Sequence, residues 1–162
     1  MAAARGCDEA LPKVGNIYFY GQAGRADAKE AAIWYEKALE KGVQGSYIYT
    51  LGLLYMQGRG VETDMSRAVH FFRKGGEMGE VHCLHQLATL HSMGVGVPLD
   101  EDKARALYEQ AGAKGMAEAF FDLGMLHVRA GDSATGLRWI QQAADAGMEK
   151  AQQFMRASKQ KR

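Results

Sequence analysis

The sequence predicts an all-α protein, a right-handed α-solenoid of antiparallel helix pairs in four repeats of about 36 residues with a C-terminal capping helix. Three observations predict it: glycines recur at regular intervals, apolar residues follow a helical period between them, and an aspartate stands at a fixed place in each interval. The recurring glycines are Gly42, Gly79, Gly115 and Gly147. Each lies 15 residues after its aspartate, namely Asp27, Asp64, Asp100 and Asp132.

The first helix of each unit is predicted by apolar residues spaced at i, i+3, i+4, i+7 and i+8. In the second unit these are Tyr47, Ile48, Leu51, Leu54 and Tyr55. A glycine inside a helix is about 1 kcal/mol less favourable than alanine, so a recurring one needs a structural reason. We expect the second helix to approach the first closely at the small residues on this face, which are Gly15, Gly52, Ala88 and Gly124.

The second helix is predicted to begin at the aspartate, whose carboxylate accepts hydrogen bonds from the free N–H groups of the first turn. The glycine 15 residues later suits a left-handed residue just past the helix end. Between the two helices, the pairs Gly58/Gly60 and Gly94/Gly96 permit a turn that other residues would strain. The fourth unit lacks four residues in this connection, because His127 stands only five residues before its aspartate.

The second unit shows the motif most fully, with Leu51-Gly52, Tyr55, Gly58, Gly60-Val61, Asp64, Ala68 and Phe71-Phe72. Written generally, it is A-x-x-x-L-G-x-x-Y-x-x-G-x-G-V-x-x-D-x-x-x-A-x-x-W/F-Y/F, closing on A-A-x-x-G. This pattern resembles the Sel1-like repeat (SLR) family, a relative of the tetratricopeptide repeats (TPR), over residues 9 to about 157. The resemblance implies a scaffold for protein–protein interaction, acting as an adaptor or as an accessory subunit of a larger complex.

The boundaries follow from the same spacing. We expect an N-terminal segment at 1–8, repeats at 9–42, 43–79, 80–115 and 116–147, a capping helix at 148–157 and a basic tail at 158–162. Gln152, Arg156 and Lys159 occupy positions that a further repeat would cover, and a polar outer face is typical of a terminal cap. A fragment cut from a longer array would show the same pattern.

The candidate binding surface consists of the first-helix residues that point away from the second helix, on the concave side of such a stack. Outward helical positions are ordinarily charged, whereas these are mostly aromatic, methionine or aliphatic, a composition typical of interfaces. We expect them to line a groove for a protein or peptide segment. They are Phe19, Tyr20, Tyr49, Leu53, Met56, His85, Thr89, Met93, Phe121, Met125, Val128 and Arg129. The alternatives are burial of this stripe within a tight superhelix, or in a homodimer. The outward positions of the second helices, Glu36 among them, are predicted to be a solvated face.

Composition disfavours other functions. The chain has 20 Lys+Arg against 19 Asp+Glu, and a net charge of +1 argues against nucleic-acid binding by bulk charge. The basic tail suits an accessory subunit of a ribonucleoprotein better. No catalytic motif is present, and the sequence indicates neither an enzyme nor a cofactor. Cysteine-rich relatives are linked with β-lactam hydrolysis, but this chain has only Cys7 and Cys83 and lacks their disulfide framework.

Metal binding and membrane insertion are also disfavoured. His82 and His85 are spaced to share a helix face, but Cys83 between them falls at a buried position of the repeat, so packing is the simpler interpretation. No apolar run is long enough to span a bilayer. The expected location is therefore cytoplasmic, with a mitochondrial location as the alternative.

Overall fold

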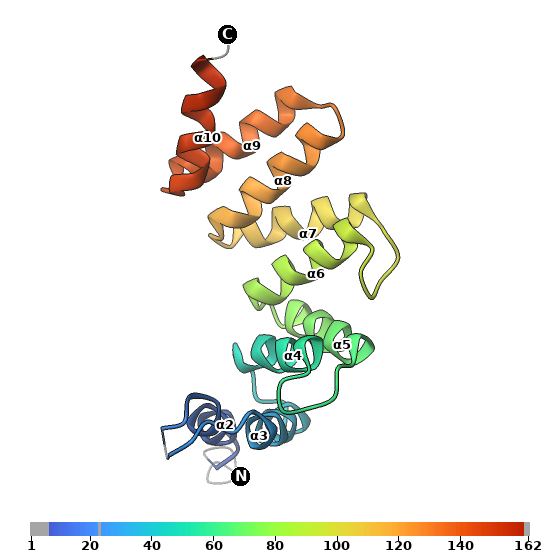
Figure 1. The fold of residues 1–162 in the computed structure, drawn as a ribbon, viewed down its shortest axis with the longest axis vertical. Helices are drawn as coiled ribbons and strands as arrows, with labels where there is room; N and C mark the ends of the chain where they lie inside the picture. Colours follow the sequence, from blue (N-terminus) through green and yellow to red (C-terminus); the bar gives the residue numbers. More distant parts are fainter. Residues whose placement is uncertain (1–6, 23, 161–162) are drawn as a thin grey trace. The chain divides into compact units, whose positions relative to one another are not determined.

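The computed structural model describes residues 7–22 and 24–160, and over these ranges its regular structure is helical (Figure 1). Residues 1–6 of the expected N-terminal segment and residues 161–162 of the expected tail lie outside this description. No helix in the described ranges is both long and apolar enough to cross a membrane. The helices are α2 (Leu11–Tyr20), α3 (Ala28–Glu40), α4 (Tyr47–Gln57), α5 (Met65–Glu77), α6 (Val81–Met93), α7 (Glu101–Ala113), α8 (Ala117–Arg129), α9 (Ser133–Asp145) and α10 (Glu149–Gln160).

The chain divides into two compact units between Cys83 and Leu84, within α6. The first unit contains the antiparallel pairs α2/α3 and α4/α5, and α3 also packs against α4. In the second unit α7 packs on α8, α8 pairs with α9, and α10 packs against α9. The predicted all-α repeat fold is therefore confirmed.

The predicted aspartate cap is present at the start of the second helix in each of the four repeats. The Asp64 carboxylate accepts a hydrogen bond from the backbone N–H of Arg67 at 2.9 Å. Asp27, Asp100 and Asp132 cap α3, α7 and α9 in the same way. Each cap satisfies an N–H group that the helix itself leaves without a carbonyl partner.

The predicted glycines end the same helices. Gly42 has a φ of 70°, and the next residue, Val43, donates its N–H to the carbonyl of Ala38 at 3.0 Å. This arrangement is a Schellman motif, which needs a left-handed residue after the helix and so favours glycine. Gly79, Gly115 and Gly147 have positive φ angles too.

Close helix approach explains the small residues inside the first helices. A Cβ atom at Gly15 would lie 2.5 Å from the ring of Tyr35 on α3. At Gly52 a Cβ would overlap the ring of Phe72, which is fully buried. The glycines therefore let the second helix place a large side chain directly on the backbone of the first.

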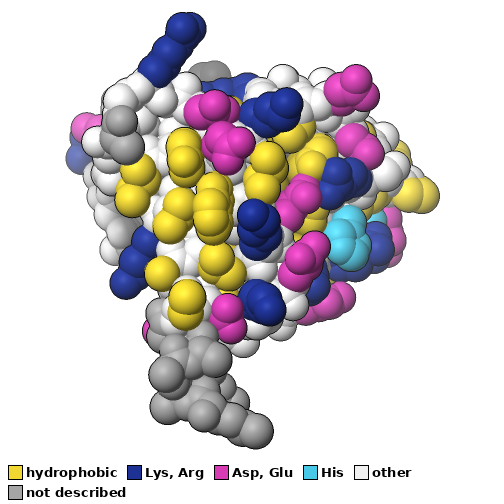
Figure 2. Space-filling model, turned by 90° about the horizontal axis from the view of Figure 1, so that it is seen from below, with side chains coloured by type: hydrophobic (Ala, Val, Ile, Leu, Met, Phe, Trp, Pro, Cys, Tyr) yellow, Lys and Arg dark blue, Asp and Glu magenta, His cyan; other side chains and the backbone are white. Residues whose placement is uncertain are grey.

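The α2/α3 pair forms the end of the first unit that is seen in Figure 2. Hydrophobic side chains gather there in a band bordered by charged residues. Leu11 and Val14 of α2 are half-buried, whereas Ile48 and Leu51, at the same positions of α4, are 1% and 0% exposed. The difference reflects packing, since α4 packs against both α3 and α5, whereas α2 packs chiefly against α3.

Candidate functional site

In the first unit the predicted stripe is partly accessible. Tyr20, at the end of α2, is 67% exposed, and its ring meets that of Phe19 edge to face with centroids 5.0 Å apart. Leu53 and Met56 on α4 are half-buried. Tyr49 is half-buried as well, because its ring packs against the neighbouring rings of Phe72 and His82, with centroid distances of 6.0 and 5.3 Å.

In the second unit the stripe begins with polar residues that bond to one another. His85 Nε2 lies 2.8 Å from Asp122 Oδ2, which joins α6 to α8. The Thr89 hydroxyl donates to the His85 carbonyl at 3.0 Å and lies 3.0 Å from the Tyr108 hydroxyl. Met93, at the end of α6, is 64% exposed.

Phe121 differs from the expectation of an open contact residue, because it is only 5% exposed. Its ring meets Phe154 of α10 edge to face at 6.1 Å, and the Lys150 ammonium lies 4.7 Å from the ring centroid. The helix expected to cap the repeats thus also covers this part of the stripe. Met125 and Val128 pack against the same hydrophobic cluster and remain partly exposed, whereas Arg129 is exposed.

Cys83 and His91 of α6 are buried. Cys83 is fully buried, and burial raises the pKa of its thiol, which disfavours the thiolate that a metal ligand or a nucleophile requires. His91 is 5% exposed, with Nδ1 3.3 Å from the Pro98 carbonyl oxygen. In the described part of the chain, no three or more His, Cys, Asp or Glu residues are grouped so that they could hold a metal ion.

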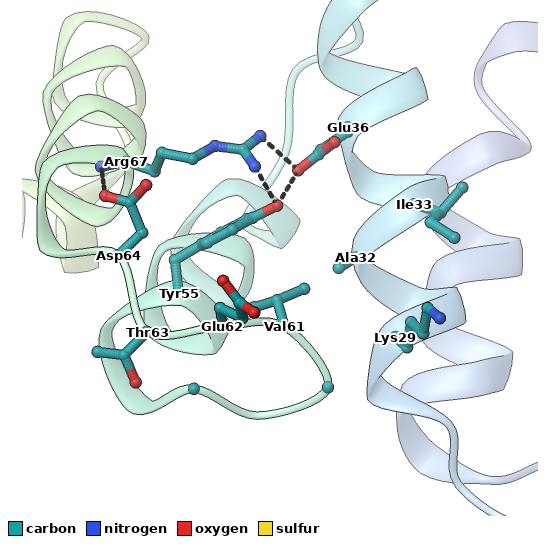
Figure 3. A pocket seen from close by; sticks show the side chains of 12 residues that line it. Lys29, Ala32, Ile33, Glu36, Tyr55, Val61, Glu62, Thr63, Asp64 and Arg67 are labelled. Atoms are coloured by element: carbon teal, nitrogen blue, oxygen red, sulfur yellow. Dashed lines mark hydrogen bonds and ion pairs between the residues drawn. The ribbon is translucent and has the colours of Figure 1, made fainter.

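A pocket of about 760 Å³ lies between α3 and the connection that joins α4 to α5 (Figure 3). Lys29, Ala32, Ile33 and Glu36 line it from α3. Residues 58–64, which form the opposite wall, contribute Val61, Glu62 and Asp64. None of these lining residues is among the binding residues that the sequence predicts.

Three side chains from three helices close one end of the pocket. The Tyr55 hydroxyl donates to Glu36 Oε1 at 2.5 Å, and Arg67 donates to the Tyr55 oxygen at 2.5 Å and to Glu36 Oε1 at 2.7 Å (Figure 3). The guanidinium lies 4.1 Å from the Tyr55 ring centroid. Burial and the bond to Glu36 raise the pKa of Tyr55 to about 12, so the hydroxyl stays protonated as a donor.

Glu36 therefore corrects one expectation. Its side chain is 31% exposed and bonded to two neighbours, rather than free on a solvated face. A sequence signal for this network exists, since Arg67 stands three residues after its capping aspartate. The corresponding residues of the other units are Glu30, Lys103 and Thr135, so only the second unit places an arginine there.

The comparisons with known proteins agree with the repeat architecture. A family model described as the Sel1 repeat matches residues 9–43, 47–80, 81–116 and 118–148. No match was found among curated proteins. A Sel1 repeat protein from Oxalobacter formigenes has a similar structure, with 27% identity and a TM-score of 0.84 over 91% of this chain and 61% of that one.

Two further solved structures are similar. The protein c5321, a protective antigen of uropathogenic Escherichia coli with an SLR fold, has 29% identity and a TM-score of 0.83 over 93% of this chain and 33% of its own. This chain thus spans 61% and 33% of the length of these two proteins. YrrB, a TPR protein with an unusual peptide-binding site, has 21% identity and a TM-score of 0.56 over 86% of this chain and 69% of its own, a likeness of fold alone.

Proposed function

The chain belongs to the Sel1 repeat family, and from this premise we propose that it is a non-enzymatic adaptor that binds a partner protein through the outward residues of its first helices. Sel1 and TPR-like repeat proteins generally mediate protein–protein interaction. The partner would offer an extended or helical segment, the two shapes that helical grooves accommodate.

The observation that carries the proposal is the exposure of large apolar side chains at outward helical positions. Tyr20 is 67% exposed and Met93 64% exposed, where a helix that meets only water would ordinarily present polar groups. Both residue types are enriched at interfaces, because tyrosine is amphipathic and methionine adapts its shape to a partner. Tyr20 lies in the first unit and Met93 in the second, so each unit would supply its own contact.

The half-buried residues beside them would extend the contact in each unit. Leu53 and Met56 would do so in the first unit, and Met125 and Val128 in the second. Arg129, which is exposed, is the charged member of the stripe, so apolar burial rather than charge would supply most of the affinity. Phe121 would act from beneath, by supporting α8, because α10 covers its ring.

The proposal is tested by affinity capture with mass spectrometry from native extract, with the double variant Tyr20→Glu/Met93→Glu as bait beside the wild type. A matched control is Val95→Glu/Leu99→Glu, which adds the same charge at two exposed apolar residues outside the stripe, 39% and 65% exposed. We expect the stripe variant to lose a protein that the wild type and the control both retain. Equal capture by all three baits would contradict the proposal.

A further inference from the structure

We propose that the pocket between α3 and residues 58–64 binds a basic side chain, arginine or lysine, presented by a partner protein. The inference shares with the proposed function only the premise that the chain binds another protein. It concerns a different surface, since the pocket residues argued below are not among the outward residues of the first helices. The experiment uses small probes, so it can fail or succeed independently of the stripe.

The pocket is preformed because backbone contacts hold the 58–64 connection, which forms one of its walls. Gly60 has a φ of 75°, and a Cβ at this position would lie 2.6 Å from the Ala28 carbonyl carbon at the start of α3. The connection also returns to its own helix, since the Arg59 N–H donates to the Leu54 carbonyl at 3.0 Å. A site of about 760 Å³ with fixed walls falls in the size range of ligand pockets.

One side of the pocket is apolar. Ala32 is 2% exposed at its floor, Ile33 is 37% exposed beside it, and Val61 faces them from the connection (Figure 3). Long basic side chains bury their methylene stems on surfaces of this kind while keeping the charged end near polar groups. This wall therefore fits the stem of an arginine or lysine.

The charged groups of the pocket favour a cation. Arg67 is already engaged, and one Glu36 oxygen accepts both its bond and that of Tyr55. For the Glu62 carboxylate and the second Glu36 oxygen, the described part of the chain provides no hydrogen-bond or ion-pair partner. An incoming guanidinium or ammonium would find these acceptors, whereas an incoming carboxylate would be repelled by them.

The lining holds two cations, and Lys29, unlike the Arg67 that pairs with Glu36, is the one that opposes this preference. Its ammonium forms no ion pair with a described residue, and it projects from the first turn of α3. Its positive charge would weaken the binding of a basic ligand. Removing that charge should consequently strengthen binding, which gives the proposal a variant with a gain as its expected result.

The charge pattern is particular to this pair of repeats. The sequence positions that correspond to Glu36 and Glu62 in the next repeat hold Arg73 and Pro98. A pocket that served only to fit neighbouring repeats together would have no need of two glutamates here alone. The difference supports a role in recognition at this one junction.

The test is titration of the isotope-labelled protein with N-acetyl-arginine methylamide, followed by amide chemical shifts. N-acetyl-norleucine methylamide and N-acetyl-glutamate methylamide serve as neutral and acidic probes. We expect saturable shifts at residues of α3 and of the 58–64 connection for the arginine probe only. Glu62→Gln should weaken its binding roughly two- to fivefold, as for a partly exposed charge pair, and Lys29→Gln should strengthen it.

Glu77→Gln is the matched control, because it removes an exposed glutamate of α5 that does not line the pocket. Unchanged affinity in this variant, with a loss in Glu62→Gln, supports the proposal. Three results would overturn it: no saturable shift, stronger binding of the acidic probe, or equal weakening by the two glutamine substitutions.

Discussion

The backbone N–H of Asp64 donates to the carbonyl oxygen of Tyr55 at 2.9 Å and closes the connection between α4 and α5. In the last repeat the N–H of Asp132 donates to the carbonyl of His127 at 3.0 Å, although four fewer residues separate this pair. The deletion therefore shortens the connection and leaves its closing bond intact. The aspartate serves twice, since its N–H closes the hairpin and its carboxylate begins the next helix.

The two functions of Asp64 can be separated by substitution. Asp64→Ala keeps the backbone bond to Tyr55 and removes the cap on the Arg67 N–H. We expect a loss of about 1 kcal/mol in the free energy of unfolding, measured by urea denaturation. Asp64→Asn retains a capping oxygen and should be close to wild type, so an equal loss in both variants would contradict the capping role.

Gly52→Ala should destabilise the protein, although alanine is the better helix former by about 1 kcal/mol. The added Cβ would overlap the ring of Phe72, which is fully buried and has no room to withdraw. The thermal midpoint should fall, and Gly52→Ala combined with Phe72→Leu should lose less stability than the sum of the two single changes. Additive losses would show that the ring does not oppose the methyl group.

The helices were predictable because each repeat contains the same local signals at the same spacing. The caps at Asp27 and Asp64 and the left-handed glycines act within a few residues of chain, so spacing alone locates them. Close approach at Gly52 was predictable for a similar reason, since a glycine inside a helix requires a neighbour that excludes a side chain.

Contacts between elements far apart in sequence were not predictable from this periodicity. Phe121 occupies an outward helical position, and only the placement of α10 determines that its ring is covered. Glu36 and Arg67 are 31 residues apart and belong to different repeats, so their pairing depends on how α3 meets α5. A helical wheel describes the faces of one helix and carries no information about which distant helix packs against a given face.

The Glu36–Arg67 pair should contribute modestly to stability. Their side chains are 31% and 46% exposed, and pairs of this kind are worth about 0.2–1 kcal/mol. We expect a double-mutant cycle of Glu36→Gln and Arg67→Met, followed by urea denaturation, to give a coupling energy in this range. Tyr55→Phe removes the shared hydroxyl and should reduce the coupling. No coupling in the wild-type background would show that the contact does not join the repeats in solution.

Alkaline unfolding should depend on Tyr35. Burial raises the pKa of this side chain to about 12 from its usual 10.0, with a smaller contribution from the charge of Tyr20. Its folded-state pKa is therefore above the unfolded value, so its contribution to stability is complete below pH 10 and is lost as the pH rises toward 12. Tyr35→Phe should weaken the fall in stability over this window, measured by denaturation at a series of pH values. Tyr20→Phe, at an exposed position, serves as the control and should leave most of the fall in place.

Acidification should lower the stability of the fold through Asp132, whose pKa is shifted downward. Hydrogen bonds from the backbone and side chain of Thr135 hold the pKa of this carboxyl below its usual 3.8, and the charges of His127 and Arg138 act in the same direction. Because the folded pKa is depressed, the ionised cap stabilises the fold above pH 3.8, and this contribution is lost as the pH falls through the folded pKa. Asp132→Asn keeps a capping oxygen that does not titrate, so its stability should fall less than that of the wild type on acidification. Asp145→Asn removes an exposed aspartate from the end of the same helix and is the matched control. An equally flattened acid profile in both variants would assign the effect to net charge and not to the cap.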